Sequence, residues 1–546
     1  MKFCLISLVR RRISPIVWVM LFEALILLMG NSHIVPDIME SRNLIAAREM
    51  VEEGNWLIPT MNGELRLAKP PLPTWISAGQ LLLTGNSWAA QRIPAALAGC
   101  FMLYWLYMLV LSMTRSRLLA CLSVLLLGTC TNFLLLAKTI SWDIYCHTFL
   151  LGALYHLWLL LSSSGHPLRH TLLAGLFVGM SIMSKGPVSL YALFLPFVIA
   201  CWMMYRHEAH LHLRWLPAVV LIALISGCLW YGYVAWSCYD ESMDTLHLES
   251  GNWMNHSIRP WWYYITFFVE TGLWAPLCLL SLVFPLWKQR VSHPRHYLFS
   301  LLWMVAALVL LSVLPEKKNR YLLPVVIPAA IAMAHVVDYW FHRLKTLPLL
   351  QQRLFRGISI LILLTHISLF LLCLYALFYL LLSPLPVFLL MGLLLLCLAW
   401  DLRAVRRLSV QRLLGSVLLG FASVACFGMP LASHLLSNPH YSSPCPIINE
   451  RYPRLSVYSP ESTSIRIELV YDLRRKVTPV QNNAQLLSCA PCLFICPDDQ
   501  PCLNLPKQLR ERMVSLGHYN GDRQPPRKGH PRPSLCYRLY YLPPAP

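Results

Sequence analysis

The chain has 546 residues, of which 57% are apolar and only 13% charged, and its formal net charge is +20. Soluble domains carry nearer a quarter charged residues, and apolar runs of about 18 to 25 residues recur here, each long enough to cross a bilayer as a helix. We predict a polytopic α-helical membrane protein, because the alternating segments of a β-barrel are absent. Lys and Arg in short loops explain the charge, so no nucleic-acid partner is expected.

About thirteen transmembrane spans are expected. The N-terminal segment carries Arg10, Arg11 and Arg12 and lacks a small-x-small cleavage site, so a retained first span with a cytoplasmic N-terminus is predicted. Alternate loops hold most of the later Lys and Arg, which agrees with the positive-inside rule. The expected spans are 14–32, 90–114, 117–137, 143–162, 170–185, 187–205, 215–237, 262–286, 297–314, 321–341, 357–382, 384–400 and 413–436.

The first outer loop, residues 34–75, is unusually rich in charge for so apolar a chain. Its segment SRNLIAAREMVEE is expected to be helical, which makes Asp37 either a helix cap or a catalytic carboxylate. Glu40 is a candidate catalytic carboxylate, with a simple ion pair to Arg42 as the alternative. Lys69 and Arg42 are candidates to bind a phosphate, against an interfacial anchor for Lys69 and a salt bridge for Arg42.

Further ionisable residues are predicted to lie on the same outer face, close to the lipid surface. Ionised groups at that depth are costly unless they are paired or have a task, so we interpret them together as a site. A single Lys at a helix end is usually an anchor, and Asp143 could be an ordinary helix cap. The set comprises Asp143, Lys185, His256, Arg259, Glu316, Lys318 and Arg320.

Residues 1–436 are predicted to form the membrane domain, and 437–546 a small α/β domain on the outer, periplasmic side. Strands are expected at 454–459, 492–496 and 535–543, and helices at 464–477 and 505–517. An even number of cysteines in this domain favours disulfides, with free thiols or a zinc site as alternatives. These cysteines are Cys445, Cys489, Cys492, Cys496, Cys502 and Cys536.

Bases beside a membrane surface suit a lipid phosphate, and carboxylates nearby suit a general base or a divalent metal. Together they indicate group transfer from a polyprenyl-phosphate sugar, in which cations stabilise the charge on the leaving phosphate. An acceptor hydroxyl needs a carboxylate base, whereas an ionised phosphate acceptor needs none.

Several linked motifs strengthen this interpretation, since they occur in a fixed order. The chain resembles the bacterial aminoarabinose transferases that modify lipid A, within the protein O-mannosyltransferase-like, GT-C membrane glycosyltransferases. The motifs are Glu40-Ser41-Arg42, Ala47-Arg48-Glu49-Met50, Asn55 to Gly63, Lys69-Pro70-Pro71-Leu72 and Arg92-Ile93-Pro94-Ala95-Ala96, with weaker matches at Asp143, 183–186, 259–263 and 320–324.

The resemblance implies an inverting transferase of the inner membrane that takes a sugar from an undecaprenyl-phosphate carrier at the periplasmic face. It implies that Lys69, Arg42 and Arg259 hold the carrier phosphate, that Asp143 sits in the site, near a divalent metal if one is used, and that Lys185 and the 317–320 turn line it. Met39 and Ala68 depart from acidic positions of the family, which fits either a phosphate acceptor or a divergent branch with other substrates.

Three alternatives remain open at this stage. The acceptor could be lipid A or a protein, because both reactions use the same donor. A lipid-carrier flippase would need ionisable residues along a path across the whole bilayer, whereas here they concentrate on one face. A structural protein would depend on residues 437–546 alone.

Overall fold

The computed structural model describes residues 15–544 except 164, 209, 256, 381–382, 462–464, 499–506 and 524–531. The chain divides into two compact units. Unit 1 comprises Met1–Asn31, Leu67–Pro73 and Arg92–Met429, and unit 2 comprises Ser32–Arg66, Thr74–Gln91 and Pro430–Pro546. The second unit therefore contains most of the first outer loop as well as the C-terminal residues.

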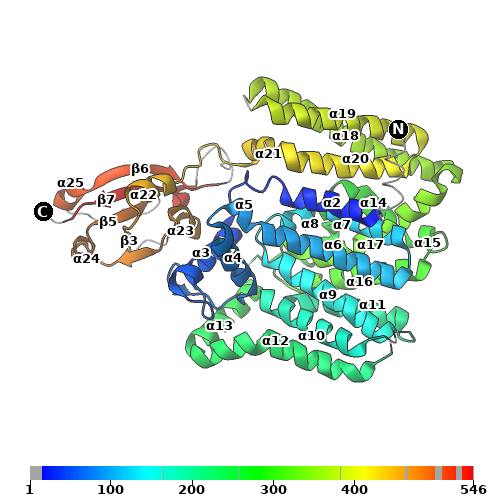
Figure 1. Cartoon of the computed structure of the whole chain (residues 1–546), viewed down its shortest axis with the longest axis horizontal. Helices are drawn as coiled ribbons and strands as arrows, with labels where there is room; N and C mark the ends of the chain where they lie inside the picture. The colour runs from blue at the N-terminus through cyan, green and yellow to red at the C-terminus, as the bar shows by residue number, and fades with distance from the viewer. Residues whose placement is uncertain are drawn as a thin grey trace. The chain divides into compact units, whose positions relative to one another are not determined.

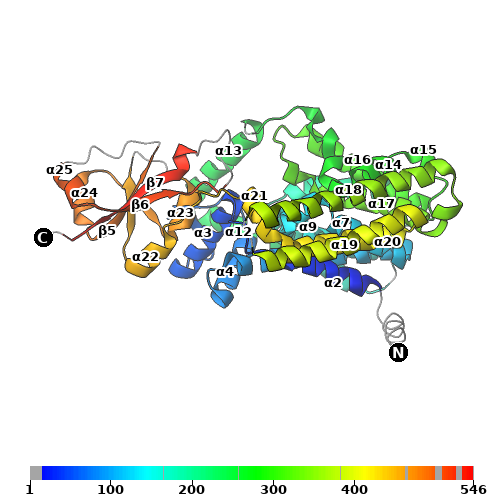
Figure 2. The same ribbon diagram turned by 90° about the horizontal axis from the view of Figure 1, so that it is seen from above.

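Unit 1 is a bundle of apolar helices, as the composition predicts. Its helices lie side by side, with α6, α9 and α10 adjacent in one part of the bundle and α18, α19 and α20 in another (Figure 1 and Figure 2). The main apolar helices, including the short α8 that continues α7 after a bend, are α2 (Pro15–Leu28), α6 (Ile93–Thr114), α7 (Arg117–Gly128), α8 (Thr131–Ala137), α9 (Trp142–Ser162), α10 (Pro167–Lys185), α11 (Leu195–Tyr205), α12 (Leu216–Ser237), α16 (Pro294–Val313), α17 (Leu323–Arg343), α18 (Leu349–Tyr379), α19 (Pro384–Arg407) and α20 (Val410–Ser423).

Further elements connect these helices. The amphipathic helix α13 (Tyr239–Asn255) and the irregular segment η3 (Trp261–Trp274) follow α12. The others are η1 (Leu190–Phe194), η2 (Leu213–Trp215), α14 (Ala275–Ser281), α15 (Phe284–Trp287), η4 (Asn319–Leu322), η5 (Leu344–Thr346), η6 (Val424–Gly428) and α21 (Met429–Leu436), which continues into unit 2.

The protein is a polytopic helical membrane protein. Within the described residues, nine helical segments are long and apolar enough to cross a bilayer, and the pair α7–α8, bent by 70°, raises the number to ten. Every one of the thirteen expected spans corresponds to helical structure, but α2, α10 and η1–α11 do not pass that test of length and hydropathy. The figure of thirteen spans stays a prediction.

The C-terminal part of unit 2 is the expected α/β structure. Five strands form one mixed sheet in the order β4-β3-β5-β7-β6, in which β3 pairs in parallel with β4 and β5, and β7 pairs antiparallel to β5 and β6. Their bounds are β3 (Val457–Pro460), β4 (Val477–Val480), β5 (Cys492–Pro497), β6 (Val514–Asn520) and β7 (Cys536–Leu542), and the helices are α22 (Cys445–Arg451), α23 (Ile467–Leu473), α24 (Asn483–Ser488) and α25 (Lys507–Arg512).

Two details of the C-terminal prediction were wrong. The helix expected through Gly517 ends at Arg512, and the next residues form β6, because pairing with β7 supplies backbone partners for a Val- and Tyr-containing segment. The disulfide expectation also fails for most of the cysteines. Cys496 is disulfide-bonded and Cys502 lies outside the described residues, but the remaining four are free thiols: Cys445, Cys489, Cys492 and Cys536.

The loop of residues 34–75 supplies the other part of unit 2. It contains α3 (Ile38–Glu53), the two-stranded hairpin of β1 (Thr60–Met61) and β2 (Glu64–Leu65), most of α4 (Leu72–Thr84), and α5 (Trp88–Gln91). Helix α3 packs against α23, and a small apolar core of Ala47, Met50 and Ala78 joins α3 to α4. Loop and C-terminal sheet therefore fold as one body.

Candidate functional site

A buried ion pair joins the start of α9 to the end of α10 in unit 1. Ser141 caps α9 by accepting a hydrogen bond from the Asp143 amide at 3.1 Å, so the cap role considered for Asp143 belongs to Ser141. The Asp143 carboxylate is only 3% exposed and pairs with the ammonium of Lys185, the last residue of α10. The two predicted site residues are thus brought together.

The turn between α16 and α17 is held by its neighbours. Residues 257–259 pair with 315–317 through backbone hydrogen bonds, including Arg259 N to the Pro315 carbonyl at 3.2 Å. The Tyr264 hydroxyl accepts from Lys318 N at 3.0 Å and donates to the Lys318 carbonyl at 3.1 Å. The Tyr263 hydroxyl donates to Asn319 Oδ1 at 2.7 Å. The positions of the charged residues in this turn are therefore fixed by the η3 segment.

Tyr321 is the centre of the predicted cluster. Lys185 Nζ lies 4.5 Å from the centroid of its ring, Lys318 Nζ 5.8 Å and Arg320 Cζ 5.5 Å. The Glu316 carboxylate pairs with Lys318 and accepts from the Tyr321 hydroxyl at 3.5 Å. Three cations around one aromatic ring, with two carboxylates, make a set suited to binding an anion.

Other predicted residues of unit 1 lie outside the Tyr321 contacts. Lys69 Nζ is 3.1 Å from Glu249 Oε2 of α13, and each of the two side chains is 30% exposed. Arg259 lies 5.7 Å from the Tyr263 ring centroid. His256 lies outside the described residues. The sequence analysis missed Tyr321 and Glu249; Tyr321 directly follows Arg320, whereas nothing in the sequence links Glu249 to Lys69.

Asp37 and Glu40 of unit 2 form a reciprocal cap at the start of α3. Asp37 Oδ1 accepts from Glu40 N at 2.8 Å, and Glu40 Oε2 accepts from Asp37 N at 3.2 Å. This capping box satisfies backbone donors that the helix start leaves open. Asp37 therefore caps the helix, which is one of the two roles predicted for it. The same contact gives Glu40 a structural role in addition to the predicted catalytic role.

The motifs next to α3 also have structural roles. Asn62 and Gly63 adopt φ values of +58° and +83°, as the tight turn of the β1–β2 hairpin requires. Glu49 holds this turn, because its carboxylate accepts from Asn62 N at 2.7 Å, Gly63 N at 3.2 Å and Thr60 Oγ1 at 2.7 Å. The Asn62 side chain in turn exchanges two hydrogen bonds with the Val477 backbone of β4, at 2.8 and 3.1 Å.

Two arginines of unit 2 act on each other electrostatically. Arg42 is exposed on α3, and Arg66 directly follows the hairpin. Burial, and then the positive charge of Arg42, lower the pKa of Arg66 to about 10. Burial likewise lowers the pKa of Arg48, although the carboxylates of Glu52 and Glu49 oppose the shift. Like charges in this proximity favour an anion as their ligand.

The described residues do not fit a divalent metal at Asp143. No group of three or more His, Cys, Asp or Glu side chains that could hold a metal gathers within the part of the chain that the structure describes. The partner of Asp143 is an ammonium, which supplies the positive charge that a metal would bring. No step of the reaction is therefore assigned to a metal.

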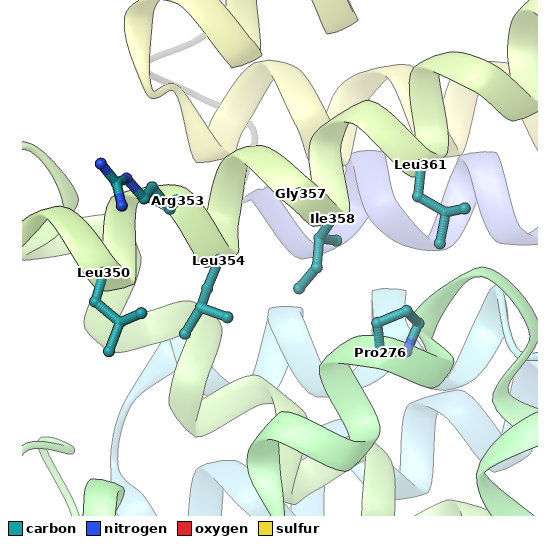
Figure 3. A pocket seen from close by; sticks show the side chains of 7 residues that line it. All are labelled: Pro276, Leu350, Arg353, Leu354, Gly357, Ile358 and Leu361. Carbon is teal, nitrogen blue, oxygen red and sulfur yellow. The ribbon is translucent and has the colours of Figure 1, made fainter.

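One hollow of unit 1 is apolar and separate from the charged cluster. It has a volume of about 330 Å³ and lies between α18 and Pro276 of α14. Leu354 and Ile358 line its α18 side, while the Arg353 side chain points away from Pro276 (Figure 3). An apolar hollow on the surface of a membrane helix is suited to contact with lipid chains and lacks the polar groups of a catalytic site.

Comparisons with known proteins agree with the fold. The family model described as dolichyl-phosphate-mannose-protein mannosyltransferase matches residues 68–231. The solved structure of ArnT from Cupriavidus metallidurans bound to undecaprenyl phosphate superposes with a TM-score of 0.64 at 16% identity, covering 96% of this chain and 98% of that one. The chain therefore has the fold of ArnT. The apo structure of the same ArnT gives a TM-score of 0.63 at 17% identity.

The chain is also similar in sequence to arabinosyl transferases. The undecaprenyl phosphate-alpha-4-amino-4-deoxy-L-arabinose arabinosyl transferase of Erwinia tasmaniensis is 29% identical over 55% of this chain and 54% of its own length. That of Pectobacterium atrosepticum is 26% identical over 63% of this chain and 62% of its own length. The chain thus spans 54% and 62% of the lengths of these two curated relatives, less than two thirds of either.

Proposed function

We propose that the protein is an inverting glycosyltransferase that moves a sugar from an undecaprenyl-phosphate carrier to lipid A at the periplasmic face of the bacterial inner membrane. The observation that carries the proposal is the cluster of Lys185, Lys318 and Arg320 around Tyr321. Support comes from the relatives, whose name states the undecaprenyl-phosphate aminoarabinose donor, and from the solved ArnT, which binds undecaprenyl phosphate.

The cluster suits the leaving group of such a reaction. When the bond from the anomeric carbon to the carrier phosphate breaks, both electrons stay on the phosphate oxygen, and fixed cations stabilise that charge. Lys185 and Lys318 each have a carboxylate partner, which holds them in place before the donor arrives. Lys69, with Glu249 beside it, is a further cation that we assign to the carrier phosphate, in addition to Lys185, Lys318 and Arg320. Arg42 and Arg259 stay predicted phosphate contacts.

The carboxylates near the site bear on which acceptor the enzyme uses, because only some acceptors need a carboxylate base. An ionised phosphate of lipid A can attack the anomeric carbon from the side opposite the carrier, forming the new carbon–oxygen bond with inversion and without loss of a proton. A base is then unnecessary, which agrees with Met39 and Ala68 at the two family acidic positions and with the use of Asp37 and Glu40 as a capping box. A protein hydroxyl would instead need a base.

Transfer can be measured with the purified protein in liposomes that contain the lipid-linked aminoarabinose donor and lipid A. We expect product with the intact chain and a rate at least about a hundredfold lower for Lys318→Ala, the scale seen when one charge-stabilising donor is removed. Lys345→Ala, an exposed lysine of η5, is the matched control and should retain activity. Movement of donor between leaflets without product would indicate a flippase instead.

A protein acceptor is the second candidate, because the matching family model is that of a protein mannosyltransferase. The same liposomes with a Ser- and Thr-rich peptide in place of lipid A distinguish the two. Glycosylated peptide, with lipid A unmodified, would replace lipid A as the acceptor and leave the donor assignment intact.

A further inference from the structure

A second hollow in unit 1 lies at the opposite end of the α9–α10 pair from Asp143 and Lys185. Asp143 is in the first turn of α9, whereas Tyr155 and His156 are near its end; Lys185 ends α10, whereas Arg169 and His170 are near its start. With a rise of about 1.5 Å per residue, the two ends are roughly 20 Å apart. The hollow has a volume of about 240 Å³, and α6 supplies its third wall.

The polar lining of this hollow includes a histidine pair and one arginine. Nδ1 of His156 and Nδ1 of His170 are 3.0 Å apart, so one ring donates to the other. In the neutral pair the ring that accepts through Nδ1 carries an Nε2–H donor, and a pair that takes up one proton has two such donors. The Arg169 guanidinium also lines the hollow, and no carboxylate is among the described lining residues. His156 is buried, at 4% exposed, which makes this a built site rather than a surface patch.

The backbone adds to the same polarity. Arg169 and His170 lie in the first turn of α10, a helix of 19 residues that starts at Pro167. The N-terminal end of a helix carries a partial positive charge and backbone N–H groups without intrahelical partners. A carboxylate-free hollow with an arginine, a histidine pair and a helix start selects for an anion.

The remaining walls are aromatic and face the lipid zone. The ring centroid of Trp105 lies 5.5 Å from that of His156, 5.7 Å from that of Tyr155 and 5.4 Å from that of Phe177. Beside them, Leu172 and Leu176 of α10 are 43% and 44% exposed, and Phe101 of α6 is 58% exposed. In a membrane protein such side chains contact acyl chains, so the hollow adjoins lipid as well as the interface.

We propose that this hollow binds the phosphate group of an anionic phospholipid, with its acyl chains along the exposed faces of α6 and α10. Basic pockets between transmembrane helices at a membrane surface are known to take lipid headgroups. The positive-inside pattern assigns the end of α9 to the cytoplasmic leaflet, opposite the proposed transfer site. The lipid then links α6, α9 and α10 and stabilises the helix pair that carries Asp143 and Lys185.

Lipid binding to the full chain, purified in neutral detergent, tests this proposal without any activity assay. Native mass spectrometry and thermal unfolding would be measured with phosphatidylglycerol, with zwitterionic phosphatidylcholine and with inorganic phosphate. We expect saturable phosphatidylglycerol binding that raises Tm, weaker binding of phosphatidylcholine, and no rise in Tm with millimolar phosphate. An equal effect of inorganic phosphate would assign the hollow to a free anion and overturn the lipid assignment.

Substitutions of the residues that line the hollow test whether the lipid binds there. Arg169→Gln should weaken phosphatidylglycerol binding about tenfold, since it removes charge-assisted hydrogen bonds to the phosphate. His170→Gln should weaken it too, while Arg214→Gln, an exposed arginine of η2, is the matched control and should leave it unchanged. Both hollow variants keep the buried His156. Binding that is the same in Arg169→Gln, His170→Gln and the intact chain would refute the proposed site.

Discussion

The Asp143–Lys185 pair shows at the scale of single residues how buried charges can exist in so apolar a chain. Asp143 and Lys185 are each other's opposite charge, and Tyr321 adds a cation–π contact to Lys185. Removing one partner leaves the other buried and uncompensated, which typically costs about 3–5 kcal/mol, whereas removing both can be nearly neutral.

The pair therefore gives a test that separates stability from transfer. Asp143→Asn and Lys185→Met should each lower the stability by about 3 kcal/mol, and the double variant should recover most of it, but none of the three should transfer sugar normally. Thermal unfolding in detergent, with the transfer assay beside it, measures both effects. Normal transfer by the stable double variant would remove this pair from the proposed site.

Glu49 gives a second prediction at the residue scale. Glu49→Gln replaces an ionised acceptor of three hydrogen bonds from the β1–β2 hairpin by a neutral amide, so the hairpin should loosen by about 1–3 kcal/mol. Hydrogen exchange at residues 60–65 would detect the change. Glu64→Gln, an exposed carboxylate of the same hairpin, should leave exchange unchanged; an equal effect of both variants would contradict the role of Glu49.

Arg523 makes the main connection at the scale of elements. Its guanidinium donates to Ser41 Oγ at 2.6 Å, to the Pro36 carbonyl, and to Asp472 Oδ1 at 2.9 Å, so it joins the start of α3 to α23. The guanidinium carbon lies 4.9 Å from the Tyr471 ring centroid, and the Asp472 carboxylate also accepts from the Tyr441 hydroxyl at 2.8 Å. A single buried arginine thus connects segments that are far apart in the sequence.

Replacing this arginine should release α3 from the sheet. Arg523→Gln is expected to destabilise unit 2 by about 3–5 kcal/mol, because Asp472 stays buried without its cation. Protease cleavage within 38–66 and near 472 should then accelerate together. Arg538→Gln, on the exposed side of β7, is the control and should cleave like the intact chain. Faster cleavage at only one of the two segments would show that Arg523 does not link them.

Sequence reasoning was most successful where a pattern is local. Apolar length located the helices of unit 1, and the capping signal at Asp37 located the start of α3. The sequence predicted that Asp143 and Lys185 lie on the same face of the membrane domain, but not that they form an ion pair. Their contact depends on how α9 and α10 pack against each other. The error at β6 has the same origin, because a strand at that position depends on pairing with β7, which is distant in sequence.

At the scale of the whole molecule, the main feature is that unit 2 is assembled from segments that are far apart in the sequence. The predicted division at residues 436 and 437 follows composition, whereas the compact unit combines residues 32–66 and 74–91 with the C-terminal residues. Contacts of Arg523, Asn62 and Lys476 hold these segments together. No local sequence pattern predicts these contacts, because each contact joins residues more than 400 positions apart.

This arrangement predicts the result of a truncation. Deleting 437–546 should expose the α3 and hairpin region, which loses its partners α23 and β4, while the helices of unit 1 stay folded. Hydrogen exchange should rise across residues 38–66 and stay low in α9 and α17. Unchanged protection of 38–66 in the truncated chain would show that the outer loop folds without the C-terminal sheet.

Lipid A from matched cells that carry the intact protein or Lys69→Ala gives the most direct test of the central claim. The proposed function predicts an aminoarabinose-sized mass increase on lipid A with the intact protein only, with both forms present in the membrane in equal amount. The same mass increase in Lys69→Ala cells would contradict the assigned site, and unmodified lipid A in cells with the intact protein and a supply of donor would contradict lipid A as the acceptor.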